Sequence, residues 1–199
     1  EPAILRYIVR ELDCWEGLGS NRTSDQANVT RSKAIEYYGL GKRRRCQILG
    51  DSGHVVDAHI IPESKNTLLI LVDLEPEDVD SPRNVLRLHN DIERAFDNKD
   101  VMFEFDSATT SFTLRVMNPD IEAKQLKDRT ETFLDINGRT LVLPNGNLPF
   151  RRVMAIHSFF VRRKWSMDMD EAEIRSRELL SFSMDDDAQT RIANFLKLA

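Results

Sequence analysis

Two apolar stretches separated by a loop place the strictest limits on how this chain can fold. Residues 55–64 are rich in β-branched side chains and stop at Pro62, which predicts a strand. Asp57 and His59 are two residues apart on that strand, so they project from the same face. Residues 84–105 carry apolar side chains at three- and four-residue spacing, which predicts a helix. The chain therefore has to pack at least one strand against one helix.

Polar residues on these two elements suggest a metal site. His89, Glu93 and Asp97 follow one another at four-residue intervals, so a helix would place them in one stripe. Asp57 and His59 would face this stripe from the strand. Carboxylate and imidazole groups converging from two elements form a cage for one divalent cation.

The order and spacing of these residues resemble the motif of HNH endonucleases of the ββα-metal type. The resemblance is closest to the branch with the signature A-H-I-I-P followed by N-x-L-x-L-x-x-D-[LI]-H-x-x-F-D. It lies within residues 45–105, where Cys46-Gln47-Ile48-Leu49-Gly50 would form the first strand and turn of the unit. The matching residues are Ala58-His59-Ile60-Ile61-Pro62, Asn84, and Leu88-x-x-Asp91-Ile92-x-x-x-Phe96-Asp97.

The resemblance implies roles for individual residues. His59 would be the general base, Asn84 would hold that histidine and its loop, and the metal would be bound by Glu93 and Asp97. Relatives commonly carry histidine where this chain has Glu93, and aspartate or histidine where it has Ala58. Glutamate still ligates, and it shifts the preference toward Mg²⁺ or Mn²⁺ and away from Zn²⁺ or Ni²⁺.

The ligand on the strand side is open. Asp57 is the first candidate because it shares a face with His59, and an ion pair with Arg44 or Arg45 is its alternative role. His89, one turn before Glu93 on the predicted helix, is the second candidate.

The overall charge of −5 opposes the binding of an anionic polymer, so any nucleic-acid contact has to come from a local cluster. The most basic run, Lys42–Arg45, leads directly into the predicted unit, although such a run can also be a solvated segment. A second basic cluster ends the helix predicted over residues 149–165. The predicted nucleic-acid contacts are Arg43, Arg44, Arg45, Arg162 and Arg163.

Cysteine usage bears on the compartment. The two cysteines, Cys14 and Cys46, cannot build a disulfide framework or a four-cysteine zinc site, which favours a reducing, intracellular compartment. The nucleus, or delivery into another cell, is compatible with this. No apolar run reaches the length of a membrane span, so no membrane partner is expected. The sequence begins at Glu1 rather than methionine, which leaves room for a further domain before it.

We therefore expect an α+β fold with a ββα-metal core, N-terminal helices, and a C-terminal β-hairpin with a helical extension. Residues 1–40 are predicted to be the helical segment, 41–117 the nuclease core, and 118–199 the extension, all packed as one compact unit. Asn137-Gly138 predicts a hairpin within residues 133–143. Further predictions are helices over 2–16, 24–40, 149–165, 170–182 and 187–198, and strands over 101–105 and 112–117.

The implied function is metal-dependent hydrolysis of DNA phosphodiester bonds by an endonuclease. Duplex DNA is the first expected substrate and RNA the second, and specificity should be low because no separate sequence-reading module is visible. Two alternatives remain open. One is a catalytically decayed module that keeps the fold and binds nucleic acid or acts as an effector, and the other is an RNase with the same centre.

Overall fold

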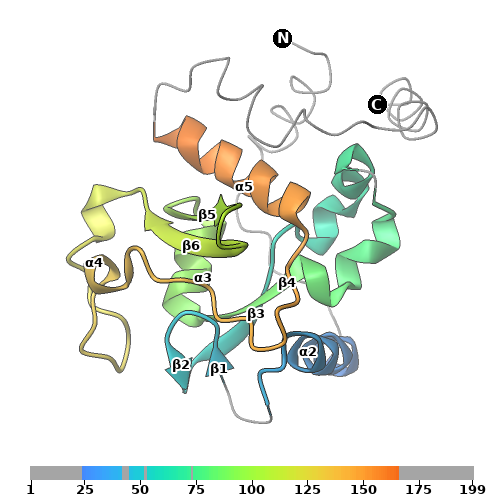
Figure 1. Cartoon of the computed structure of the whole chain (residues 1–199), viewed down its shortest axis with the longest axis horizontal. Coiled ribbons are helices and arrows are strands. Elements are labelled where there is room, and N and C mark those ends of the chain that lie inside the picture. The colour runs from blue at the N-terminus through green and yellow to red at the C-terminus, as the bar shows by residue number, and fades with distance from the viewer. Residues whose placement is uncertain (1–23, 42–44, 52, 73, 166–199) are drawn as a thin grey trace.

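Figure 1 shows the computed structural model of the chain, which describes residues 24–41, 45–51, 53–72 and 74–165. The described part combines helices with small antiparallel sheets, so the predicted α+β class is confirmed. No helix within these ranges is long and apolar enough to cross a membrane. The helices predicted over residues 2–16, 170–182 and 187–198 lie outside the described residues.

The centre of the fold is a two-stranded antiparallel ribbon. Strand β3 (Val55–His59) pairs with β4 (Val85–His89), so that Val55 lies opposite His89 and His59 lies opposite Val85. The connection between the strands is built from three 3₁₀ segments. These are η1 (Glu63–Val72), η2 (Pro76–Asp80) and η3 (Pro82–Asn84).

Helix α3 (Asn90–Asp97) begins directly after β4. The prediction of one helix over residues 84–105 is therefore wrong at Val85–His89, which forms a strand instead. All five residues of β4 are buried. A short strand buried on both faces has no alternation of apolar and polar residues, so its periodicity does not distinguish it from a buried helix.

A short hairpin is attached to the β3–β4 ribbon through β4. Strands β1 (Arg45–Cys46) and β2 (Gly50–Asp51) pair with each other. The Cys46 sulfur accepts hydrogen bonds from the backbone N–H groups of Ile48 and Leu49 at 3.4 Å and from that of His89 at 3.2 Å. The third of these bonds ties the hairpin to β4.

The predicted strand pair after α3 is confirmed, as is the predicted helix near residue 150. Strand β5 (Val101–Asp106) pairs with β6 (Ser111–Val116), and α5 (Arg151–Lys164) lies across this hairpin (Figure 1). Three side chains of α5, and that of Trp165 just after it, donate hydrogen bonds to backbone carbonyls in the segment from α3 to β5. The pairs are His157 to Phe96, Lys164 to Asn98, Trp165 to Lys99, and Ser158 to Phe103.

The hairpin predicted at residues 133–143 is wrong. A short helix, α4 (Phe133–Ile136), stands there, with Asn137 at its C-terminal end and Gly138 at a φ of 86°. Asparagine followed by glycine terminates a helix as readily as it turns a hairpin, because both settings need a positive φ. The chain then runs beside β6, with hydrogen bonds from Gly138 N to Leu114 O and from Leu114 N to Arg139 O.

Helix α2 (Ser24–Tyr38) agrees with the helix predicted over residues 24–40. Its Ala34 and Tyr38 form a small apolar cluster with Leu40 and Val85. The main core lies on the other side of the ribbon and continues from the β1–β2 hairpin to α5. Its members include Ala58, Leu86, Leu88, Ile92, Phe96, Phe103, Phe112, Phe133, Val153 and Phe160.

Candidate metal centre and catalytic site

The β3–β4 ribbon presents two different faces. Side chains of directly paired residues in an antiparallel ribbon point to the same side. Ala58 and its partner Leu86 belong to the main core, together with Ile92 of α3. His59 and its partner Val85 alternate with them, and Val85 packs on the α2 side. Since His59 is the last residue of β3, it lies at the end of the ribbon.

His59 is half-buried, and its Nε2 atom is buried. The two residues after it, Ile60 and Ile61, are fully buried in the main core. Burial on both sides of the position fixes the backbone from which the imidazole projects.

Asn84 holds the chain just beyond His59. Its side-chain oxygen accepts a hydrogen bond from Ile61 N at 3.0 Å, and its Nδ2 donates to Ile61 O at 2.9 Å and to Val79 O at 3.0 Å. The backbone adds a bond from Ile60 N to Asn84 O at 2.9 Å. Asn84 is fully buried, so its amide is committed to these partners and positions the segment that carries His59.

Glu93 and Asp97 form a carboxyl pair on one side of α3. They are four residues apart, one turn of the helix, and hydrogen-bond to each other. Burial raises the pKa of Glu93. Burial, followed by the negative charge of Glu93 and the shared hydrogen bond, raises the pKa of Asp97 to about 7. When both carboxyl groups are ionised their negative charges repel each other, and a bound cation would reduce this repulsion.

The carboxyl pair fits a hard divalent cation. Mg²⁺ is usually held by one or two carboxylates, with water and substrate phosphate oxygens completing its octahedral shell. A cation between Glu93 and Asp97 would relieve the repulsion that now raises the pKa of Asp97. Among the described residues, no group of three or more histidine, cysteine, aspartate or glutamate side chains is gathered for a metal.

Asp57, the first candidate for the strand-side ligand, faces arginines. Its Oδ2 accepts a hydrogen bond from Arg31 Nε of α2 at 2.9 Å, and its Oδ1 lies 3.6 Å from Arg87 Nε. Arg87 is the directly paired residue on β4, so this contact follows from the register. The partners of Asp57 among the described residues are thus Arg31 and Arg87, and the predicted alternative Arg44 lies outside those residues.

His89, the second candidate, does not stand on a helical stripe with Glu93. It ends β4 and caps α3, and its Nδ1 accepts a hydrogen bond from Asp91 N at 3.3 Å. The residue is 1% exposed, and burial lowers the pKa of its imidazole. His89 thus begins the helix rather than extending the row of carboxyl groups.

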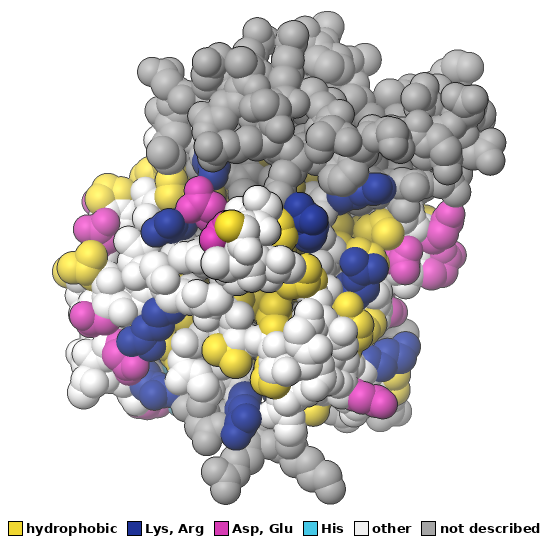
Figure 2. All heavy atoms as spheres, viewed as in Figure 1, with side chains coloured by type: hydrophobic (Ala, Val, Ile, Leu, Met, Phe, Trp, Pro, Cys, Tyr) yellow, Lys and Arg dark blue, Asp and Glu magenta, His cyan; other side chains and the backbone are white. Residues whose placement is uncertain are grey.

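The predicted phosphate contacts are in different situations. Arg43 and Arg44 lie outside the described residues, and Arg45 is exposed at the start of β1. Arg162 Nη2 lies 3.4 Å from Glu104 Oε1 on β5, whereas Arg163 is exposed. On the face seen in Figure 2, lysine and arginine side chains are dispersed among acidic and apolar ones and form no single basic patch.

Sequence reasoning missed the contribution of residues outside the motif. Arg31, which engages Asp57, is 26 positions earlier in the chain, and no local pattern announces such a pair. The motif assigns Asp91 no contact, yet its Oδ2 accepts a hydrogen bond from Lys127 N at 2.6 Å. This bond attaches a later loop, residues 125–130, to the first turn of α3.

A family model described as HNH endonuclease matches residues 46–104, which contain the β1–β2 hairpin, the β3–β4 ribbon, α3 and most of β5. No curated protein and no solved structure matches the chain.

Proposed function

Residues 46–104 belong to the HNH endonuclease family, and from this premise we propose that the chain is a metal-dependent endonuclease that hydrolyses DNA phosphodiester bonds. His59 is the proposed general base, and Glu93 and Asp97 are the proposed protein ligands of one Mg²⁺ or Mn²⁺. The observation that carries the proposal is the placement of two partly buried carboxyl groups, Glu93 and Asp97, one turn apart on α3 within the segment that the family model matches.

His59 would remove the proton from the attacking water. A neutral imidazole accepts a proton near physiological pH, which a carboxylate with an ordinary pKa does poorly. The position of the imidazole depends on Asn84, whose three side-chain hydrogen bonds hold Ile61 and Val79. Asn84 is therefore a positioning residue, because its amide is fully buried and both of its N–H groups are already donated.

Glu93 and Asp97 would supply the negative charge that retains the cation beside the scissile bond. When bound, the cation stabilises the charge that develops on the departing oxygen. The carboxyl pair projects from α3, and His59 stands at the end of the ribbon against which α3 packs. For this mechanism, the imidazole of His59 and the cation held by the carboxyl pair both have to contact the same phosphate at that end of the ribbon.

DNA is the proposed substrate because the family acts on nucleic acids and the chemistry needs only one phosphodiester. Arg45 and Arg163 are exposed and are proposed phosphate contacts, together with Arg43 and Arg44 of the same basic run. Arg162 is also a proposed phosphate contact, although it is only partly exposed and its Nη2 lies 3.4 Å from Glu104 Oε1. An RNase with the same centre would use the same residues.

A second candidate is a nucleic-acid-binding module that has lost catalysis. The observation in its favour is Ala58, a residue without ligating atoms directly before His59, together with the two-carboxyl ligand set of the described residues. Such a module would bind nucleic acid without cleaving it.

The test is cleavage by the purified chain of supercoiled plasmid, linear duplex, single-stranded DNA and RNA. Reactions contain Mg²⁺, Mn²⁺, Zn²⁺ or a chelator. We expect nicking of DNA with Mg²⁺ or Mn²⁺ and none with chelator. The double variant E93Q/D97N should lose both cleavage and calorimetric Mg²⁺ binding, whereas E36Q, an exposed carboxylate on α2, should keep both. Absence of cleavage of every substrate, with nucleic-acid binding retained, would establish the decayed module instead.

A further inference from the structure

We propose that the loop Gln125–Thr130 binds a backbone phosphate of the nucleic acid, at the opposite end of β3 from His59. This inference rests on the proposed nuclease function and extends it to a contact outside the family-matched residues 46–104. The ligand is the sugar-phosphate backbone, so the contact would not depend on base sequence.

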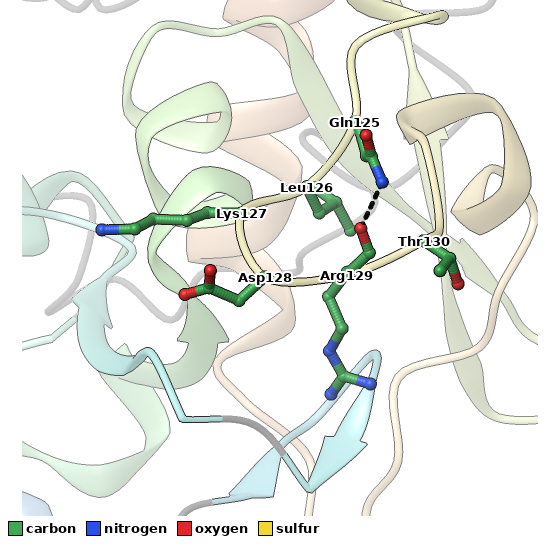
Figure 3. Close-up of a pocket in the computed structure, with 6 residues that line it drawn as sticks. All are labelled: Gln125, Leu126, Lys127, Asp128, Arg129 and Thr130. Carbon is green, nitrogen blue, oxygen red and sulfur yellow. Dashed lines mark hydrogen bonds between the residues drawn. The ribbon is translucent and has the colours of Figure 1, made fainter.

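The loop forms a shallow, open hollow on the surface (Figure 3). Its base is closed by a bridge between Gln125 and Thr132 and by a hydrogen bond from Leu126 N to Glu131 O at 2.9 Å. Gln125 Nε2 also donates to Arg129 O at 2.5 Å, across the hollow. The lining residues are Gln125, Leu126, Lys127, Asp128, Arg129 and Thr130.

The loop is fixed to the ribbon and to α3 by separate contacts. Lys127 N donates to Asp91 Oδ2 at 2.6 Å, and Asp128 Oδ2 lies 2.6 Å from His54 Nε2, just before β3. Leu126 is 1% exposed and anchors the loop in the main core. A loop held in this way loses little conformational freedom when a ligand arrives, so more of the contact energy appears as affinity.

Two cationic side chains leave the loop in different directions. Lys127 is exposed and extends away from the hollow, while Arg129 points toward the β1–β2 hairpin (Figure 3). The charge of Arg129 is close enough to lower the pKa values of Cys46 and His89, although burial is the larger influence on both. The acidic residue between the two cations, Asp128, is engaged by His54. The loop therefore brings two cationic side chains to the surface near the β1–β2 hairpin and the start of β3.

The position of the loop predicts the length of substrate that it would contact. From His54 to His59 there are five residue steps, which at about 3.3 Å per residue span roughly 16 Å. Phosphates on one strand of a duplex advance about 3.4 Å along the axis per nucleotide. A DNA strand that lies along β3 would therefore bring to the loop a phosphate about five nucleotides from the bond that is cleaved.

The experiment compares K127Q with K124Q. Lys124 is equally exposed in the same segment but does not line the hollow, so the two variants lose the same charge at neighbouring positions. Binding of a labelled duplex is measured without divalent cation over a range of salt concentrations. K127Q should reduce the slope of log K against log salt by about 0.9, which is the value of one phosphate contact, and K124Q should leave the slope unchanged.

Cleavage of bis(p-nitrophenyl) phosphate separates this proposal from the proposed function. This small diester reaches only the metal centre, so K127Q should cleave it as the wild type does while its KM for long duplex rises. Equal slopes for K127Q and K124Q, or an unchanged slope for K127Q, would overturn the loop contact. A different result is that neither the wild type nor any variant cleaves the diester or DNA, while K127Q alone reduces the salt slope. In that case the loop contact stands and the nuclease proposal fails.

Discussion

Asn84 and Ile61 are joined by two hydrogen bonds in opposite directions, one from Ile61 N to Asn84 Oδ1 at 3.0 Å and one from Asn84 Nδ2 to Ile61 O at 2.9 Å. This reciprocal pair lies two residues beyond His59 and is shielded from solvent. The amide thus replaces the strand partner that the backbone of Ile61 loses where β3 ends.

Replacing Asn84 should therefore damage stability as well as activity. Asn84→Ala leaves Ile61 N, Ile61 O and Val79 O buried without their partners, and each such loss costs about 1–3 kcal/mol. We expect chemical denaturation to show a loss of about 3 kcal/mol or more. Asn84→Asp keeps the acceptor but sets a buried carboxylate against the carbonyls of Ile61 and Val79, so at neutral pH it should destabilise the protein at least as much as Asn84→Ala. A loss below about 0.5 kcal/mol for Asn84→Ala would contradict this account.

Replacing His59 should separate catalysis from folding. His59→Ala removes the only imidazole at the end of β3, so we expect a rate reduction of about 10²–10⁴ with an unchanged thermal midpoint and Mg²⁺ affinity. Imidazole added to the solution should restore part of the activity by occupying the vacated space. Full activity in a well-folded His59→Ala protein would remove His59 from the mechanism.

The carboxyl pair predicts that cation binding depends on pH. The pKa of Asp97 is raised to about 7, so in the metal-free protein this carboxyl carries a proton below pH 7 that the cation has to displace. Mg²⁺ affinity should be nearly constant above pH 7 and fall by up to about tenfold for each pH unit below it. Calorimetry in buffers of different ionisation enthalpy would count the released proton. Affinity that is flat between pH 8 and pH 5 would exclude proton sharing at this site.

The raised pKa of Asp97 also predicts that removing this proposed metal ligand makes the metal-free protein more stable. A carboxyl whose pKa is raised in the folded state opposes folding above its unfolded pKa, and that opposition is complete above pH 7. Asp97→Asn should therefore raise the free energy of unfolding of the metal-free protein at pH 8 by an amount on the order of 1 kcal/mol after allowance for solvent screening, and chemical denaturation measures this gain. Added Mg²⁺ should stabilise the wild type and leave the variant unchanged.

Asp57 offers a test of the ligand set. Because its two oxygens face Arg31 and Arg87, Asp57→Asn should leave Mg²⁺ affinity within about twofold of the wild type. The stability should fall modestly, since Arg87 is buried and loses a charged neighbour. A loss of Mg²⁺ affinity as large as that of Glu93→Gln would show that Asp57 is the ligand on the strand side, as its place beside His59 first suggested.

His157 gives the folded state a dependence on acid. Burial lowers the pKa of its imidazole to about 4, and the ring stacks on Phe96 with 3.6 Å between ring centroids. Between pH 6.5 and about 4 the unfolded chain takes up a proton that the folded chain does not, so stability falls as pH falls through this window. The loss amounts to about 3 kcal/mol at about 1.4 kcal/mol per pH unit. The stability advantage of the wild type over His157→Gln should shrink by this amount from pH 7 to pH 4. The carboxyl groups titrate in both proteins, so their effects cancel in this difference. A constant advantage would refute it.

Local signals account for what the sequence predicted well. The β5–β6 hairpin alternates along its strands, α5 has a clear helical period, and the four-residue spacing of Glu93 and Asp97 places them on one turn. Each of these features is decided by neighbours in the chain, so sequence reasoning reaches it.

Other features depend on contacts between distant residues. The sequence pattern of β4 predicts a helix because the burial of this strand on both faces comes from α2 on one side and the main core on the other. The engagement of Asp57 by Arg31 depends on where α2 lies, and the attachment of Lys127 to Asp91 depends on a loop 36 residues further on. None of these is encoded in a spacing that a single stretch of sequence displays.

The donors of α5 have a consequence for how this module can be inherited. His157, Lys164 and Trp165 together satisfy the carbonyls of Phe96, Asn98 and Lys99, the peptide groups on either side of Asp97 and just beyond it. A genetic exchange that moved only residues 46–104 into another gene would carry both carboxyl groups but leave behind the helix that holds their turn in place. The unit that recombination has to keep whole therefore reaches at least to Trp165, well past the last residue that the family shares.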